Sequence, residues 1–124
     1  MSQIKIQHRG PLKGEVSPPP DKSISHRAVI FASLAEGRSV IKNFLAAEDP
    51  MRTLEAFRQM GIEIDHDDKT NTVVVNGKGL HGLSAPEGDI DCGNSGTTMR
   101  LMSGLLSAQP FSSTLTGDKF LLKR

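Results

Sequence analysis

The chain has 124 residues, of which 36% are hydrophobic, and this length suits one domain with a core of its own. Its 15 basic and 14 acidic residues leave a formal net charge of +1, so the overall charge gives no reason to expect a nucleic-acid partner. A run of about 18 apolar residues, as a membrane-spanning helix needs, is absent. The single cysteine, Cys92, excludes an internal disulfide and a multi-cysteine metal site. We therefore expect a soluble, cytoplasmic protein.

The amino-terminal segment has a pattern typical of extended chain. Residues 2–8 alternate, with Ile4 and Ile6 on one face, and predict a strand that no signal or transit peptide precedes. Residues 12–16 predict a second short strand. The three prolines in residues 17–20 prevent regular hydrogen bonding and predict a stiff connector. This connector is either a domain boundary or a surface loop within one domain, and composition does not separate the two.

Two helices with a strand between them are predicted next. Residues 23–35 favour a helix that ends before Gly37, and its apolar second half, residues 28–32, is expected to be buried. Residues 38–45 predict a strand. Asp49 and the proline after it predict the N-cap and first position of a second helix. The residues of this helix expected to face the core are Met51, Leu54, Phe57 and Met60.

The rest of the chain predicts a hairpin, a third helix and further short strands. These elements are a hairpin of 62–65 and 72–75, an irregular stretch over 77–88, a strand at 89–92, a helix over 97–108 and a strand at 112–116. The predicted order is β-α-β-α-β-β, followed by the start of another β-α-β. Such a mixture indicates an α/β (α+β) fold. The chain stops at Lys123-Arg124, directly after a predicted strand and turn, so we expect it to be part of a longer protein.

Residues 21–27, with the sequence DKSISHR, form the first of three candidate anion sites. Lys22 lies at a predicted helix N-terminus, where free backbone N–H groups favour negative charge. Ser23 and Arg27 are four residues apart and share a helix face. An ammonium, a hydroxyl and a guanidinium gathered there would hold a phosphate or a carboxylate. Taken alone, the residues slightly favour a helix cap beside two solvated cations, because helix caps of this composition are common.

The other two candidate anion sites lie in turns that contain glycine. Residues 92–100 hold two glycines three apart, which permit a ligand to approach main-chain N–H groups closely, although a tight strand-to-helix turn needs the same residues. This run matches neither a Walker loop nor a dinucleotide fingerprint. The third candidate is Gly117-Asp118 with Arg124 six residues later, for which a turn and a frayed terminus are the alternative.

Metal and nucleic-acid sites are not indicated. The four histidines have no ligand-like spacing, and a buried, inert thiol is the favoured reading of Cys92. The basic residues scatter among acidic ones, and the chain has no Trp or Tyr.

Taken together, the three candidate sites resemble the signature blocks of the 5-enolpyruvylshikimate-3-phosphate (EPSP) synthase family. Residues 21–27 and 93–100 match the first two blocks in order and spacing, and residues 115–124 resemble the third, usually Gly-Asp-x-Ser-Leu-x-x-Arg-Pro-Met. Phe120 stands where that block usually has Ser, and Leu101 stands where many members have Pro. The related UDP-N-acetylglucosamine enolpyruvyl transferases typically have Lys-Asn in the first block, so Lys-Ser here favours the shikimate enzyme. The resemblance covers essentially the whole chain but only the first part of an enzyme that is several times longer.

The resemblance implies a transferase of the shikimate pathway, which serves aromatic amino acid biosynthesis. Such an enzyme moves the enolpyruvyl group of phosphoenolpyruvate to the 5-hydroxyl of shikimate 3-phosphate and releases phosphate. The reaction passes through a tetrahedral intermediate without a metal or organic cofactor. By resemblance, Lys22 is catalytic and contacts both substrates, since its charge can stabilise the anionic groups of the intermediate. The remaining implied roles are shikimate 3-phosphate binding by Ser23 and Arg27, and phosphoenolpyruvate binding by Asn94, Gly96 and Arg124.

The resemblance also implies the fold. The family has two domains of repeated β-α-β-α-β-β units, with the active site between them. We therefore expect residues 21–124 to be the first, incomplete part of the N-terminal domain. Residues 1–20 would supply strands of the partner domain and the proline-rich crossover. Because further acid/base groups would come from sequence beyond Arg124, we expect this chain alone to be inactive and the whole enzyme to be monomeric.

Two other functions stay open at this point. The first is a non-catalytic anion-binding module of the same fold, which a natural stop codon after Arg124 would favour. The second is a relative that acts on RNA ends, against which the near-neutral charge and the lack of Trp and Tyr weigh. Continuation of the parent gene through roughly two further domain-lengths would favour the enzyme.

Overall fold

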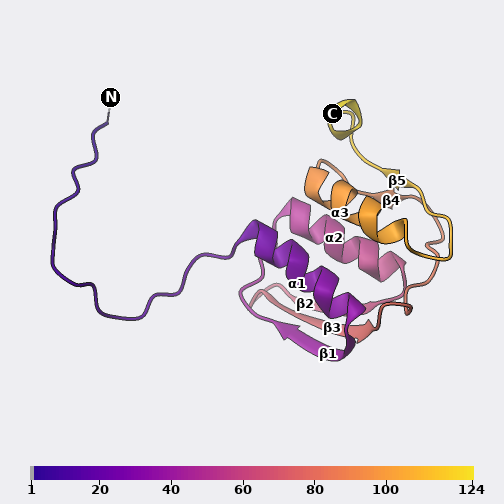
Figure 1. The fold of residues 1–124 in the computed structure, drawn as a ribbon, viewed down its shortest axis with the longest axis horizontal. Helices are drawn as coiled ribbons and strands as arrows, with labels where there is room; N and C mark the ends of the chain where they lie inside the picture. The colour runs from indigo at the N-terminus through magenta and orange to yellow at the C-terminus, as the bar shows by residue number, and fades with distance from the viewer. Residues whose placement is uncertain (1) are drawn as a thin grey trace.

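A computed structural model describes residues 2–124 and places a layered α/β body after a long extended segment (Figure 1). Two helices pack on a three-stranded sheet, and a third helix packs on the second of these, beside a pair of short strands. The elements in chain order are α1 (Lys22–Leu34), β1 (Glu36–Ile41), α2 (Glu48–Gln59), β2 (Glu63–Asp67), β3 (Thr72–Lys78), β4 (Ile90–Asp91), α3 (Gly96–Leu106), β5 (Leu115–Thr116) and the 3-10 helix η1 (Leu121–Lys123).

The larger sheet is antiparallel, with β3 between β1 and β2. Val73 and Val75 of β3 are fully buried. They lie two residues apart and therefore share one face of the strand, which is the face that the helices cover. The predicted hairpin is confirmed as β2 and β3. The smaller sheet pairs β4 with β5 in parallel, which holds the start of α3 beside the carboxy-terminal turn. The expected α/β class is confirmed.

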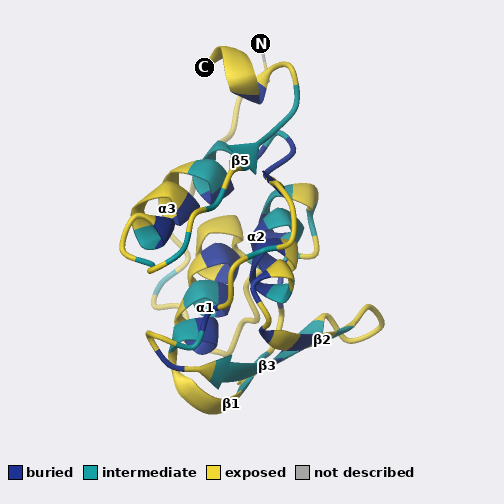
Figure 2. Cartoon of the chain, turned by 90° about the vertical axis from the view of Figure 1, so that its right-hand side faces the viewer, coloured by how far each residue is buried: buried dark blue, intermediate teal, exposed yellow. Residues whose placement is uncertain are grey.

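The hydrophobic core lies between the large sheet and the helices (Figure 2). In α2, Leu54, Phe57 and Met60 are buried as the helical period predicts, while Met51 is only partly buried. The expectation that residues 28–32 are buried throughout is wrong at Phe31, whose exposed fraction is 67%. Phe31 lies on the face of α1 that turns away from both α2 and the sheet.

The expected strands at residues 2–8 and 12–16 are wrong. This segment is extended but unpaired, and its apolar side chains are exposed. A β-strand needs a neighbour to accept and donate its backbone hydrogen bonds, and residues 2–20 have no such neighbour among the described residues. The recorded contact of this segment with the body is a 3.2 Å hydrogen bond from Asn43 Nδ2 to the Pro18 carbonyl.

The helix starts depart from prediction in an informative way. Asp21 is the N-cap of α1, where its carboxylate accepts a 2.7 Å hydrogen bond from the Ile24 N–H. The expected cap at Asp49 is wrong, because α2 begins two residues earlier than predicted, with Ala47 as an N-cap without a side-chain bond. Gly37 does not end α1 either, since it lies inside β1 with a positive φ of 94°. The carboxylate of Asp49 is therefore free to interact outside its own helix.

Candidate functional site

Three helices begin at one cleft. Lys22 opens α1, Glu48 and Asp49 open α2, and Gly96 opens α3. Each helix N-terminus carries a partial positive charge and unpaired backbone N–H groups, so their convergence favours an anion. The cleft has a volume of ≈ 590 Å³ and is lined by Lys22, Glu48, Asp49, Asn94, Gly96, Thr97, Arg100 and Arg124.

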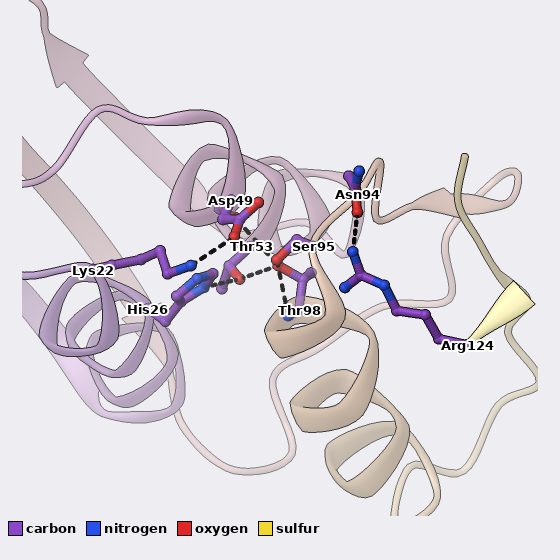
Figure 3. Close-up of polar contacts among 8 residues, drawn as sticks. All are labelled: Lys22, His26, Asp49, Thr53, Asn94, Ser95, Thr98 and Arg124. Atoms are coloured by element: carbon purple, nitrogen blue, oxygen red, sulfur yellow. Dashed lines mark hydrogen bonds and ion pairs between the residues drawn. The ribbon is translucent and has the colours of Figure 1, made fainter. Parts of the chain in front are cut away.

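The Lys22 side chain bridges the first two helices. Its Nζ lies 3.0 Å from Asp49 Oδ2, and both side chains remain partly exposed to the cleft (Figure 3). An exposed ion pair of this kind adds at most about 1 kcal/mol to stability. Its effect is therefore chiefly one of position: it keeps an ammonium group at the mouth of the cleft.

The carboxy-terminal residues carry a second cation to the opposite side of the cleft. Arg124 Nη2 donates a 2.7 Å hydrogen bond to Asn94 Oδ1 (Figure 3). Asp118 holds the turn before it, because its Oδ1 accepts from the Leu121 N–H at 2.8 Å. A Cβ at Gly96 would lie 3.4 Å from Arg124 Nη1, so the missing side chain leaves the guanidinium room over the start of α3. The alternative of a frayed terminus is wrong for this segment.

The first turn of α3 offers backbone donors. Ser95 caps the helix, and its hydroxyl accepts from the Thr98 N–H at 3.1 Å. Within residues 2–124, no acceptor is recorded for the backbone N–H groups of Gly96 and Thr97, which both line the cleft. The amino-terminal N–H groups of a helix have no partner inside the helix, so these two can serve a ligand.

Of the six residues expected to form the site, the structure gathers four at the cleft: Lys22, Asn94, Gly96 and Arg124. Ser23 and Arg27 do not line it. Both are exposed on α1, and neither side chain has a recorded hydrogen bond or ion pair within residues 2–124. They lie on the helix that carries Lys22, outside the described hollow.

Sequence reasoning missed a set of buried polar residues behind the cleft. His26, Thr53, Ser95 and Thr98 join the three helices through consecutive hydrogen bonds of 2.7 to 2.9 Å. Burial lowers the pKa of His26, an effect that Asp49 opposes and Lys22 reinforces. The bonded pairs lie up to 45 residues apart, so no local pattern could have revealed them.

Cys92 lies just before the cleft turn but does not line the cleft. It is fully buried, and burial raises the pKa of its thiol, with Asp91 adding to the rise and Arg52 opposing it. The predicted buried thiol is confirmed. Within the described residues, no group of three or more His, Cys, Asp or Glu is gathered as a metal ion would require.

Comparison with known proteins agrees with this geometry. The family model described as EPSP synthase (3-phosphoshikimate 1-carboxyvinyltransferase) matches residues 6–124, which include every residue of the cleft. The chain belongs to the EPSP synthase family. The resemblance drawn from the three sequence blocks is thereby confirmed.

Individual members of the EPSP synthase family are similar over nearly all of the chain. A 3-phosphoshikimate 1-carboxyvinyltransferase of Thermodesulfovibrio yellowstonii is 58% identical over 91% of the chain, and one of Citrifermentans bemidjiense is 51% identical over all of it. A solved EPSP synthase from Acinetobacter baumannii superposes with a TM-score of 0.84 and 49% identity over 90% of the chain. The chain spans only about a quarter of these proteins, namely 26%, 28% and 25% of their lengths.

No helix formed by residues 2–124 combines the length and the apolar character needed to cross a membrane.

Proposed function

We propose that this chain supplies the amino-terminal part of an EPSP synthase active site. The whole enzyme would transfer the enolpyruvyl group of phosphoenolpyruvate to the 5-hydroxyl of shikimate 3-phosphate and release phosphate. The observation that carries the proposal is the convergence of three helix N-termini with Lys22, Arg100 and Arg124 at one cleft. Both substrates are polyanions, and such a cleft suits phosphate and carboxylate groups.

The residues of the cleft divide the work between the two substrates. Lys22 is proposed to contact both and to stabilise negative charge as the tetrahedral intermediate forms. Asn94, Gly96 and Arg124 would hold phosphoenolpyruvate, and the mutual contact of Asn94 and Arg124 supports their assignment to one ligand. No metal or organic cofactor enters the proposed reaction.

Ser23 and Arg27 are proposed to hold shikimate 3-phosphate on the outer face of α1. Their exposure leaves both side chains available to a ligand at the amino-terminal end of α1. Lys22 lines the cleft and directly precedes Ser23, so a ligand that spans both places could contact it.

The remaining expectations concern the whole enzyme. We propose that residues 21–124 begin its N-terminal domain and that residues 1–20 pair with strands of a partner domain. The extended and unpaired state of residues 2–20 supports this proposal. The whole enzyme is proposed to be a cytoplasmic monomer without a nucleic-acid partner. The chain alone is proposed to be inactive, because the relatives are about four times as long.

An amide NMR titration of the 124-residue chain with shikimate 3-phosphate tests the proposal. We expect shifts concentrated in residues 22–27 that exceed those caused by inorganic phosphate. Lys22→Met should weaken this binding about tenfold to a hundredfold, since a charged hydrogen bond contributes roughly 1.5 to 3 kcal/mol. Lys69→Met, in the β2–β3 turn, is the matched control and should leave binding unchanged.

Two results would contradict the proposal. Equal shifts with shikimate 3-phosphate and phosphate, unaffected by Lys22→Met, would remove Lys22 from the site. Release of phosphate from phosphoenolpyruvate and shikimate 3-phosphate by the purified chain would contradict its inactivity.

A further inference from the structure

A continuous line of hydrogen bonds runs behind the cleft through three helices. His26 Nδ1 of α1 lies 2.7 Å from Thr53 Oγ1 of α2, which lies 2.9 Å from Thr98 Oγ1 of α3. Thr98 Oγ1 in turn lies 2.7 Å from the hydroxyl of Ser95, the N-cap of α3. All four residues are fully buried. In Figure 3 this line lies between the Lys22–Asp49 pair and the Asn94–Arg124 pair.

The line ends on a group that can only accept. Thr98 Oγ1 also donates to the backbone carbonyl of Asp49 at 3.2 Å. A carbonyl has no hydrogen to give, so the Thr98 hydrogen is committed to Asp49. The oxygen of Thr98 must then accept from both Ser95 and Thr53. Because the Thr53 hydrogen is now used, Thr53 must accept from His26, which requires a hydrogen on Nδ1.

This assignment is the one that supplies every contact with a hydrogen. It places a hydrogen on His26 Nδ1. The ring is fully buried, which disfavours a second proton, so Nε2 keeps a lone pair. Nε2 is buried and has no hydrogen-bond partner among residues 2–124. The opposite tautomer would bury an unpaired N–H, which native structures avoid more strictly than an unpaired acceptor. The charged side chains that act on the ring are Lys22 of α1 and Asp49 of α2.

We propose that His26, Thr53 and Thr98 are positioning residues, in which the neutral Nδ1–H form of His26 fixes α1 and its Lys22 relative to the turn that carries Asn94 and Gly96. This inference rests on the proposed function for its consequence, but not for its geometry. The hydrogen bonds all point from α1 and the α3 cap toward the Asp49 backbone. The side chain of that same Asp49 holds Lys22. The hydrogen-bond line therefore links the relative positions of the three helices to the position of the Lys22 ammonium group.

The tautomer is tested first, on the unmodified chain and without any ligand. Nitrogen-15 NMR of the imidazole at neutral pH should show a protonated Nδ1 and an unprotonated Nε2 for His26. An Nε2–H tautomer, or rapid averaging between the two forms, would overturn the inference. The outcome does not depend on whether the chain binds shikimate 3-phosphate, so it separates this inference from the proposed function.

A pair of variants then tests the positioning role. Thr53→Val removes the central hydroxyl and should shift the amides of Asn94 and Gly96, abolish the His26 tautomer preference and weaken shikimate 3-phosphate binding about tenfold. Thr53→Ser keeps the hydroxyl and should restore all three readouts. Thr72→Val, a half-buried threonine of β3 outside the line, is the matched control and should alter none of them.

Either of two results would overturn the positioning role. If Thr53→Val leaves the tautomer and the Asn94 and Gly96 amides as they are in the unmodified chain, the hydroxyl groups do not fix the position of α1 relative to the turn with Asn94 and Gly96. If Thr53→Ser fails to restore them in a folded protein, packing rather than hydrogen bonding is responsible.

Discussion

The environment of His26 acts on the pKa of its ring in opposite directions. It is a titratable ring with no exposed surface, and it lies near both a cation and an anion. Burial dominates and lowers the pKa, so the folded chain holds the ring neutral at a pH where an unfolded chain begins to take up a proton. The hydrogen-bond line through Thr53 depends on that neutral form.

This lowered pKa predicts a loss of stability in mild acid. The unfolded state binds a proton near pH 6.5 while the folded state resists it, so the free energy of unfolding should fall as the pH drops below about 6.5. The fall ends once the pH is below the folded pKa, and its slope cannot exceed about 1.4 kcal/mol per pH unit for one proton. Urea unfolding between pH 7.5 and 5 measures it.

His26→Asn should flatten the slope in this pH range, because it removes the titrating ring. His81→Asn, at an exposed position, should keep it. Identical slopes for the unmodified chain and His26→Asn would assign the acid sensitivity to other groups.

Single residues also show where sequence reasoning stops. The burial of Cys92 follows from its place at the end of a short strand, on the same face as the buried Ile90. Asp49, in contrast, stands before a proline and predicts a local cap, yet it pairs with Lys22, 27 residues earlier. The residues around Asp49 do not indicate this pairing, because its partner lies in another helix and the observed N-cap, Ala47, has no capping side chain.

At the level of elements, prediction succeeds where the determinants are local. Helix periodicity and nearby breakers place all three α-helices to within a few residues. The hairpin is equally well predicted, because Ile62 and Ile64 alternate with acidic residues and a polar turn separates them from the second strand. The strands expected at 2–8 and 12–16 fail for the opposite reason, since a strand exists only where another strand meets it.

The contact between α1 and β3 depends on a glycine. A Cβ at Gly77 would lie 2.2 Å from the carbonyl oxygens of Ala32 and Ala35, at the end of α1. We predict that Gly77→Ala destabilises the chain by about 3 kcal/mol, since the backbone must separate to admit the methyl group. Chemical denaturation measures this difference.

The matched control is a glycine on the free side of a helix. Gly104 in α3 has no atom within 4 Å of a Cβ position, so Gly104→Ala should stabilise by about 0.5 to 1 kcal/mol through helix propensity alone. A similar effect of both substitutions would refute the close packing of α1 on β3.

At the level of the whole molecule, residues 2–16 are extended and almost entirely exposed, so we expect them to add little to the stability of the folded body. Deletion of residues 2–16 should change the free energy of unfolding by less than about 0.5 kcal/mol, as expected for exposed residues. The deletion also removes the exposed Ile4 and Ile6, so any concentration-dependent association of the chain should decrease. Urea unfolding and sedimentation measure the two effects.

Asp21→Ala provides the comparison, since it removes the α1 cap and should destabilise by about 1 kcal/mol. A large loss of stability after the deletion alone would show that residues 2–16 contribute to the folded body.

The convergence of three helix starts is a property of the whole fold. Sequence alone identified two of these turns as separate anion sites, each with an ordinary structural alternative. Their union followed only from the family resemblance, because the starts of α1 and α3 lie more than 70 residues apart along the chain. In the folded chain both turns line the same cleft, so their cations and free N–H groups can act on one ligand.

In the ion pair between Lys22 and Asp49, the Asp49 carboxylate occupies the place that an anionic ligand would take beside the ammonium. Without a ligand, the Lys22 ammonium is already paired with the Asp49 carboxylate. A ligand with a single negative charge attracts the ammonium no more strongly than Asp49 does. A doubly charged phosphate offers more, and the displaced Asp49 remains stabilised at the N-terminus of α2. A dianion should therefore compete for the Lys22 ammonium better than a simple carboxylate does.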